Sequence, residues 1–229
     1  MAAVERAIAS LGERRPNEID ACTIFAALGI PSAPSAVIRA PGDPVNLGFP
    51  VVAKVLSADV PHKTNVGGVV IGLNDEREVR EAAAGIIERV SQRCPEATLD
   101  GILVQRMERG LVEVILGFRR DPEVGPIVVL GVGGVLAEVY RDVAIRIAPT
   151  TPDEARSMID EVRGLAVIRG YRNLPKGDCA ALAEAIVAFS GLAAIESAAI
   201  AEAEINPLLV KAAGEGVVAV DGLIVLQRK

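Results

Sequence analysis

A chain of 229 residues and 23.9 kDa contains 51% hydrophobic residues but only 3% aromatic ones, a composition typical of α/β proteins with aliphatic cores. Its formal net charge of −6 argues against a nucleic-acid-binding surface. The three cysteines form no CxxC pair, which excludes the usual zinc motif and favours the reducing cytoplasm. The first residues lack a signal-peptide pattern and the apolar runs are short, so we expect no membrane association.

The hydrophobic pattern predicts helices and strands that fall into two halves. In chain order, the predicted helices lie at about 17–28, 75–92, 151–162 and 178–196. The predicted strands lie at about 33–38, 50–56, 66–73, 101–107, 111–118, 126–130, 135–140, 143–148, 202–211 and 217–226. The best internal boundary is at 105–110, where a small α/β half gives way to one richer in antiparallel-looking strands. We therefore expect an N-terminal helix and a small subdomain over 1–104, and a larger subdomain over 105–229.

His62 is the single histidine, and it lies in the sequence PHKTNVGG after a strand that carries Lys54. A metal site is a poor interpretation, because one histidine without nearby cysteines supplies too few ligands. Two interpretations stay open from the residues alone. The imidazole is either an ordinary exposed loop side chain or a nucleophile that carries a phosphoryl group, since neutral imidazole is a competent nucleophile near neutral pH.

Lys54 lies inside the apolar strand sequence PVVAKV, where an unpaired buried ammonium group would be costly. It either reaches solvent at the edge of a strand or meets an anion such as phosphate. The glycine pair Gly67-Gly68 favours the anion, because glycine lets the backbone approach a ligand closely. The pair matches neither a Walker loop nor a dinucleotide-binding fingerprint, so a nucleotide would bind on another scaffold.

Three oxygen-bearing side chains lie close together near the C-terminus. Glu204 and Asn206 are two residues apart on a predicted strand and so face the same side, and Asp221 follows on the next strand. Such ligands suit Mg²⁺ held jointly with nucleotide phosphates. The alternative is a hairpin in which the Asn-Pro pair forms a turn. Arg146, between two isoleucines, is expected to face an internal anion or an ion-pair partner.

Taken together, these motifs resemble the ATP-grasp β subunit of ADP-forming acyl-CoA synthetases, such as acetate–CoA ligase. The resemblance covers about residues 17–221, and the histidine loop is its most specific part because generic ATP-grasp ligases lack it. The matching stretches are FPVVAKV (49–55), PHKTNVGGV (61–69), VQRM (104–107), EVILG (113–117), RDP (120–122), GP (125–126), GVGG (131–134), EV (138–139), DVAIRIAP (142–149) and EINP (204–207).

The resemblance implies an α/β (α+β) ATP-grasp fold of two subdomains with the nucleotide bound between them. It also implies an acid–CoA ligase (ADP-forming) that catalyses acid + CoA + ATP = acyl-CoA + ADP + phosphate. The partner would be a CoA-binding α subunit or domain, in an α2β2-type assembly. His62, on a mobile loop, would relay a phosphoryl group between that partner and ADP or ATP, and Mg²⁺ would accompany the nucleotide.

Residue by residue, the resemblance implies that Lys54 contacts the nucleotide phosphates and that Arg146 helps to neutralise the transferring phosphoryl group. The implied adenine hinge and ribose neighbour are Val104, Gln105, Met107 and Glu113. The implied Mg²⁺ ligands are Glu204, Asn206 and Asp221.

Two departures from the family pattern stand out. Only Arg39 to Gly48 fills a segment that usually contains a helix, and Leu223 stands where the family tends to place a basic residue. These departures support an alternative, a non-catalytic nucleotide-sensing or scaffolding subunit. A stand-alone ATP-grasp ligase is a third possibility, which would leave His62 without a purpose.

Overall fold

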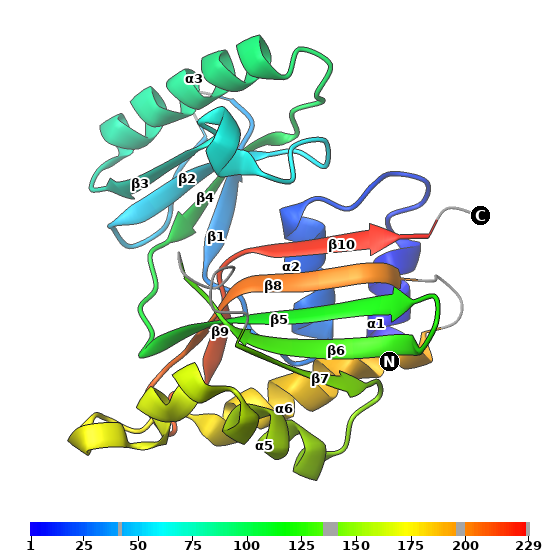
Figure 1. The fold of residues 1–229 in the computed structure, drawn as a ribbon. Coiled ribbons are helices and arrows are strands. Elements are labelled where there is room, and N and C mark those ends of the chain that lie inside the picture. Colours follow the sequence, from blue (N-terminus) through cyan, green and yellow to red (C-terminus); the bar gives the residue numbers. More distant parts are fainter. Residues whose placement is uncertain (41–42, 135–141, 196–199, 228–229) are drawn as a thin grey trace. The chain divides into compact units, whose positions relative to one another are not determined.

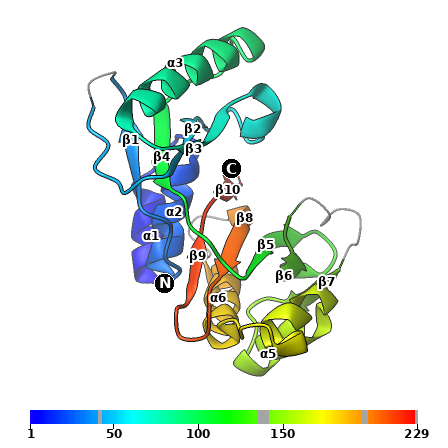
Figure 2. The same ribbon diagram turned by 90° about the vertical axis from the view of Figure 1, so that its left-hand side faces the viewer.

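The computed structural model describes residues 1–40, 43–134, 142–195 and 200–227 (Figures 1 and 2). The chain divides into two compact units, a smaller one of Ala33–Glu108 and a larger one of Met1–Ser32 with Arg109–Lys229. Within the described ranges, every helix is too short or too polar to cross a membrane.

The smaller unit is a four-stranded antiparallel sheet covered on one face by α3 (Figure 1). Its strands, in the order β1-β4-β2-β3, are β1 (Ser35–Ile38), β4 (Gly101–Arg106), β2 (Val51–Leu56) and β3 (Val69–Leu73). Helix α3 (Glu76–Arg93) begins at Asp75, whose side chain accepts from the N–H of Glu78. Apolar side chains spaced three and four residues apart on α3 form a buried stripe against the sheet.

The larger unit is a six-stranded antiparallel sheet in the order β10-β8-β5-β6-β7, with β9 paired to β8. Its strands are β5 (Val112–Asp121), β6 (Gly125–Val132), β7 (Val143–Ile147), β8 (Ile200–Val210), β9 (Val217–Ala219) and β10 (Gly222–Leu226). Its α-helices are α1 (Ala2–Ala9), α2 (Glu18–Ala27), α5 (Pro152–Glu161) and α6 (Cys179–Ser190). Short 3-10 helices are η2 (Arg163–Arg169), η3 (Tyr171–Asn173) and η4 (Gly191–Ala194).

One face of the larger sheet carries the core of its unit. Along β5, Val114, Leu116 and Phe118 are buried and join one apolar cluster with side chains of the four α-helices. The intervening residues of β5 face the other way, because successive side chains alternate across a strand. Polar side chains of β5 on that second face therefore point away from this core.

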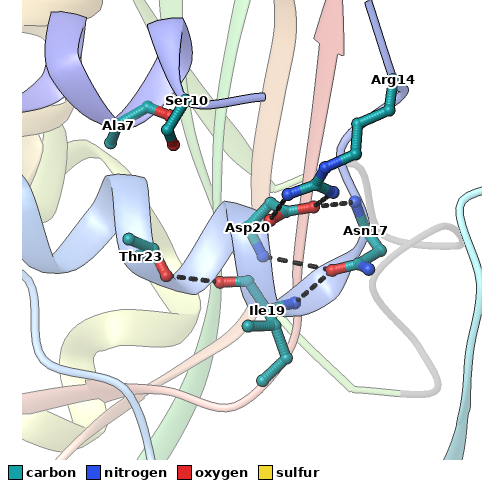
Figure 3. Close-up of polar contacts among 7 residues, drawn as sticks. All are labelled: Ala7, Ser10, Arg14, Asn17, Ile19, Asp20 and Thr23. Carbon is teal, nitrogen blue, oxygen red and sulfur yellow. Dashed lines mark hydrogen bonds and ion pairs between the residues drawn. The ribbon is translucent and has the colours of Figure 1, made fainter. Parts of the chain in front are cut away.

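The start of α2 shows how local sequence fixes an element (Figure 3). Asn17 Oδ1 accepts from the N–H groups of Ile19 at 3.1 Å and Asp20 at 3.2 Å, while Asp20 accepts from the Asn17 N–H at 2.9 Å. Arg14 adds an ion pair to the same carboxylate, with Nη2 to Oδ1 at 2.7 Å. This reciprocal capping box satisfies N–H groups that have no partner inside the helix, so the helix begins where the sequence predicts.

Most predicted elements are confirmed, with boundaries shifted by a few residues. The predicted strand at 66–73 starts late, because η1 (Lys63–Val66) ends in a turn at Gly67 with a φ of 70°. The final predicted strand divides into β9 and β10, and α1 was not predicted. The strand predicted at 135–140 lies outside the described residues.

The division of the chain differs from the predicted one at its N-terminus. The prediction joined the N-terminal helix to the small subdomain, whereas Met1–Ser32 groups with Arg109–Lys229. The reason is packing, since Phe25 of α2 lies 5.6 Å from Phe189 of α6 between ring centroids, and both belong to the core of the larger unit. The other division falls at Glu108 and Arg109, inside the predicted boundary region.

Candidate functional site

His62 lies at the exposed tip of the loop that joins β2 to β3, here called the histidine loop (residues 57–68). It occupies the N-cap position of η1, yet within the described chain its imidazole makes no capping hydrogen bond. This exposure agrees with both interpretations that the sequence left open, an ordinary loop side chain and a phosphoryl-carrying nucleophile. Its position supplies an imidazole that solvent and a ligand can reach.

Both ends of the histidine loop are tied to the smaller unit. At the first end, Ser57 Oγ donates to the carbonyl of Thr98 at 2.6 Å, and the N–H of Thr98 donates to Oδ2 of Asp59 at 2.9 Å. At the second end, the N–H of Val55 on β2 donates to the carbonyl of Gly68 at 2.7 Å. A side chain at position 68 could not fit, because its Cβ would lie 2.7 Å from Cγ1 of Val55. Both stems of the loop are therefore held by hydrogen bonds, and His62 lies between them.

Lys54 and Gln105 share the face of the small sheet that α3 does not cover. Lys54 of β2 stands opposite Leu103 of β4, and Val52 stands opposite Gln105, so these four residues project on one side. Both polar side chains are buried, Lys54 at 5% exposure and Gln105 at 1%. Oε1 of Gln105 has no hydrogen-bond partner within the described residues. This buried acceptor lacks a donor, an arrangement that a bound ligand would relieve.

Val104 and Met107, the other two predicted hinge residues, offer a ligand different groups. The side chain of Val104 points to the opposite face of the sheet and belongs to the core beneath α3. The N–H of Met107 donates to the carbonyl of Pro50 at 3.1 Å, so that group is already engaged. The Met107 side chain is 41% exposed. A ligand contact at Met107 would therefore use the thioether side chain, and one at Val104 would use only the backbone.

In the larger unit, two of the predicted magnesium ligands, Glu204 and Asn206, lie on β8, and the third, Asp221, lies just before β10. Nδ2 of Asn206 donates to Oε1 of Glu204 at 3.1 Å, and the N–H of Asn206 donates to the carbonyl of Asp221 at 3.2 Å. Oδ1 of Asp221 accepts from the N–H of Gly222 at 2.8 Å. Glu204 faces away from the core, because its strand neighbours at 203 and 205 are buried in it.

These ligands are of the right chemical type for Mg²⁺, which prefers carboxylate and amide oxygens. Among the described residues, no three His, Cys, Asp or Glu side chains form a metal-binding group. Two carboxylates and one amide do not fill an octahedral site, so phosphate oxygens and water would have to supply the remaining ligands. The donor set fits a metal that arrives with a nucleotide.

Glu113 and Leu223 lie on the same outward face as Glu204. Glu113 of β5 is exposed, and its carbonyl accepts from the N–H of Gly133 at 2.7 Å. Leu223 of β10 stands directly opposite Glu204. A basic residue at position 223 would therefore face that carboxylate across the two strands, and this chain has an apolar side chain there instead.

Arg146 is held apart from this group. On β7 it stands opposite Val128, a residue of the core face, and it points toward α5. Its Nη2 donates to Oε2 of Glu161 at 2.7 Å and to Oγ of Ser157 at 3.2 Å. Of the two partners expected from the sequence, the ion pair is the one observed. The structure thus places Arg146 on the face of the sheet opposite to Glu204, where it joins a strand to a helix.

Sequence reasoning did not identify the side chains that tie the histidine loop down. Besides Ser57 and Asp59, these are Arg89 and Arg93 of α3, which donate to carbonyls of the loop. The sequence held one signal of this role. Gly85 is an unfavourable residue in the interior of α3, whose other residues are mostly good helix formers.

Comparisons with known proteins agree with this architecture. Residues 7–226 match the family described as the ATP-grasp domain. The acetate–CoA ligase (ADP-forming) I subunit beta of Pyrococcus furiosus is 36% identical over 219 residues, covering 93% of each chain. The ADP-forming acetate–CoA ligase I of Archaeoglobus fulgidus is 38% identical over 199 residues, 85% of this chain but 29% of that protein. The chain thus spans less than a third of that longer relative.

Solved structures extend the similarity to three dimensions. The dinucleotide-forming acetyl-coenzyme A synthetase 1 of Ca. Korarchaeum cryptofilum, in complex with coenzyme A, Ca-AMPCP and HgCl+, matches with a TM-score of 0.89 at 35% identity, over 99% of this chain and 100% of that one. A second complex of that enzyme, with coenzyme A and Mg-AMPPCP, matches with a TM-score of 0.79 at 33% identity over 99% of each chain. In it, a phosphohistidine segment points towards the nucleotide-binding site. The chain therefore belongs to the ATP-grasp family and, within it, to the β subunits of ADP-forming acyl-CoA synthetases.

Proposed function

We propose that this chain is the nucleotide-binding subunit of an ADP-forming acid–CoA ligase, and that His62 carries the phosphoryl group to and from the nucleotide. The observation that carries the proposal is the exposed imidazole at the tip of a loop whose two stems are tied down. A carrier needs this combination, because it must reach a donor and an acceptor while returning to the same place.

The proposed step is a phosphoryl transfer at a ring nitrogen of His62. In the direction of ATP synthesis, the P–N bond of phosphohistidine breaks, a β-phosphate oxygen of ADP forms a new P–O bond, and the imidazole leaves as a neutral base. In the reverse direction, the neutral imidazole attacks the γ-phosphorus of ATP and ADP leaves. Little covalent chemistry is asked of other residues, so their work is positioning and charge stabilisation.

The remaining roles follow from the chemistry of each side chain. Lys54 binds phosphate oxygens through its ammonium group, and Gln105 accepts from the adenine amino group through its buried Oε1. Val104 contributes backbone, Met107 its exposed side chain, and Glu113 a carboxylate for the ribose. The ligands for Mg²⁺ are Glu204, Asn206 and Asp221. Bound Mg²⁺ supplies neutralisation of the phosphate charge.

The partner in this proposal is a CoA-binding α subunit or domain, which makes the acyl phosphate and the thioester, in an α2β2-type assembly. Two findings support it: the match to a separate β subunit in Pyrococcus furiosus, and the coverage of only part of the longer Archaeoglobus fulgidus ligase. A cytoplasmic location, predicted from the isolated cysteines, belongs to the same proposal. Arg146 has a structural role in it, because its guanidinium is committed to α5.

The test uses the chain with a CoA-binding α subunit, Mg²⁺ and ATP labelled at the γ-phosphate. We expect protein-bound phosphate that is labile to acid and stable to base, and that disappears in His62→Ala. Thr64→Ala is the matched control, because it alters an exposed side chain of the same loop and should keep the label.

Label that persists in His62→Ala would overturn the relay. Nucleotide binding without any label, in the presence of an active partner, would favour the alternative of a non-catalytic nucleotide-sensing or scaffolding subunit. Leu223 opposite Glu204 is the observation that supports this alternative.

A further inference from the structure

Arg89 links helix α3 to the second stem of the histidine loop. Its Nε donates to the carbonyl of Gly67 at 3.0 Å, across 22 residues of sequence. Gly67 lies five residues after His62 and is the second-last residue of the loop, just before β3 begins. Arg93, one turn further along α3, donates more weakly to the carbonyl of Asn65 at 3.3 Å. The helix therefore holds the loop by its backbone carbonyls, close to the start of β3.

A glycine in the middle of α3 makes room for this arginine. A methyl group at position 85 would lie 2.9 Å from Nη1 of Arg89, closer than real Cβ contacts come. Gly85 is unfavourable for a helix interior, because glycine has more backbone freedom to lose than alanine. The helix thus carries a locally unfavourable residue at the place where the Arg89 guanidinium folds back over it.

A second glycine bounds the same guanidinium from the loop side. Gly67 has a φ of 70°, which L side chains rarely adopt, and a Cβ there would lie 3.0 Å from Nε of Arg89. Arg89 is therefore seated in a slot with a glycine on either side, one from the helix and one from the loop. By contrast, Arg80 of the same helix forms an ordinary i,i+4 ion pair with Glu76 on the surface.

We propose that Arg89, seated between Gly67 and Gly85, is a positioning residue that fixes the pivot of the histidine loop and so aligns His62 for phosphoryl transfer. The inference rests on the proposed function for its consequence in catalysis, and on the contacts above for its place. Misplacing a reacting group by about 1 Å can cost about 100-fold in rate, so a loosened pivot has a measurable effect.

The experiment compares four variants: Arg89→Ala, Arg89→Lys, Gly85→Ala and the control Arg80→Ala. His62 of the intact chain is phosphorylated chemically with phosphoramidate, which needs no partner subunit, and Mg-ADP is added to follow ATP formation in a single turnover. Because the chain has one histidine, its imidazole NMR signals report on the loop without ambiguity. Thermal unfolding is measured on every variant.

We expect Arg89→Ala to slow the transfer about tenfold or more and to change the exchange broadening of the His62 signal. Arg89→Lys should recover part of the rate, since an ammonium can donate to one carbonyl but lacks the planar fork. Gly85→Ala is the discriminating variant. Alanine favours the helix yet requires the guanidinium end of Arg89 to shift, so we expect a slower transfer, smaller in effect than that of Arg89→Ala, with unchanged or raised thermal stability. Arg80→Ala should behave as wild type.

Transfer rates and His62 signals in Arg89→Ala and Gly85→Ala that match wild type would overturn the positioning role. A rate loss in Gly85→Ala that only tracks a loss of thermal stability would also overturn it. If phosphorylated wild type forms no ATP, the proposed function fails, while the His62 signal still decides the inference. An altered signal in Arg89→Ala and not in Arg80→Ala then supports the pivot, and an unaltered one rejects it.

Discussion

The two units carry their polar groups in opposite ways. In the smaller unit, Lys54 and Gln105 are buried on a sheet face, and the exposed imidazole of His62 lies on a tethered loop. In the larger unit, Glu204 and Asn206 project from a long strand on the face without core packing. Under the proposed assignments, the magnesium ligands on β8 gain their geometry from paired strands, whereas His62 gains its geometry from two anchored stems of a loop.

The largest effect should come from the buried cation. Lys54→Met is expected to weaken ADP binding about 10- to 100-fold, because a hydrogen bond to a charged group contributes about 1.5–3 kcal/mol. Isothermal titration calorimetry with Mg-ADP measures the change. Lys176→Met, at an exposed lysine of the larger unit, is the control and should bind as wild type. Equal affinities in both variants would remove Lys54 from the nucleotide site.

Arg120 also donates hydrogen bonds to backbone carbonyls, but we expect it to stabilise the fold and not to position a reacting group. Arg120 donates to the carbonyls of Ile200 at 3.2 Å and of Ala193 and Ile195 at 3.1 Å each. Arg120→Ala should lower the free energy of unfolding by about 2–3 kcal/mol, since three carbonyls lose a charged donor.

Urea unfolding measures this loss, and single-turnover transfer from phosphorylated His62 in the folded protein should stay near wild type. Arg119→Ala is the neighbouring control, because Arg119 is exposed and forms a surface ion pair with Asp121. If Arg120→Ala slowed the transfer without lowering the free energy of unfolding, Arg120 and Arg89 could not be assigned different roles.

The carboxylate of Asp178 makes the stability of the larger unit sensitive to acid. The N–H of Ala181, with those of Gly216 and Gly214, donates to this carboxylate and lowers its pKa below the ordinary 3.8. A lowered pKa in the folded state means that the stabilisation is complete above pH 3.8 and is lost as the pH falls through the folded value.

Asp178→Asn should therefore cost about 1 kcal/mol of unfolding free energy at pH 7, because the three N–H donors lose a charged acceptor and keep a neutral one, and hydrogen bonds to charged groups are the stronger kind. It should also flatten the loss of stability below pH 4, roughly where a free aspartate titrates. Chemical denaturation at a series of pH values checks both. An unchanged pH profile would show that these three N–H donors do not set the acid sensitivity.

The smallest expected effect concerns the outward face of the larger sheet. Leu223→Arg would place a guanidinium beside the proposed site, opposite Glu204, where it can pair with a phosphate oxygen of Mg-ATP, and exposed pairs of opposite charge contribute about 0.2–1 kcal/mol. We expect Mg-ATP to bind up to about fivefold more tightly, with little change in transfer rate. Val225→Arg, opposite Glu202 on the same pair of strands, is the matched control. Equal gains in both variants would mean that net charge alone is responsible.

Much of this arrangement could be predicted from sequence, because it is local. The capping residue Asn17, the alternation along β5 and the spacing of Glu204 and Asn206 each act over a few residues. The opposite faces of Val104 and Gln105 also follow from strand alternation, once their strand is identified.

What sequence could not supply is the meeting of distant segments. The bond from Arg89 to Gly67, the partner of Arg146 on α5 and the packing of Phe25 on Phe189 depend on tertiary contacts. No local propensity encodes them. The role of Gly85 illustrates this limit, since its cost is visible in sequence and its purpose becomes visible only beside Arg89.

The buried Oε1 of Gln105 has a consequence for base selection. Within the described residues, it is an acceptor with no donor. Under the proposed assignment, the 6-amino group of adenine satisfies it, whereas the 6-oxo group of guanine would bring a second acceptor into a dry site. Sites that hydrogen-bond one substrate reject analogues lacking the matching group strongly, because a buried polar atom is then left unpaired. One amide oxygen would thus make the enzyme choose ATP over GTP.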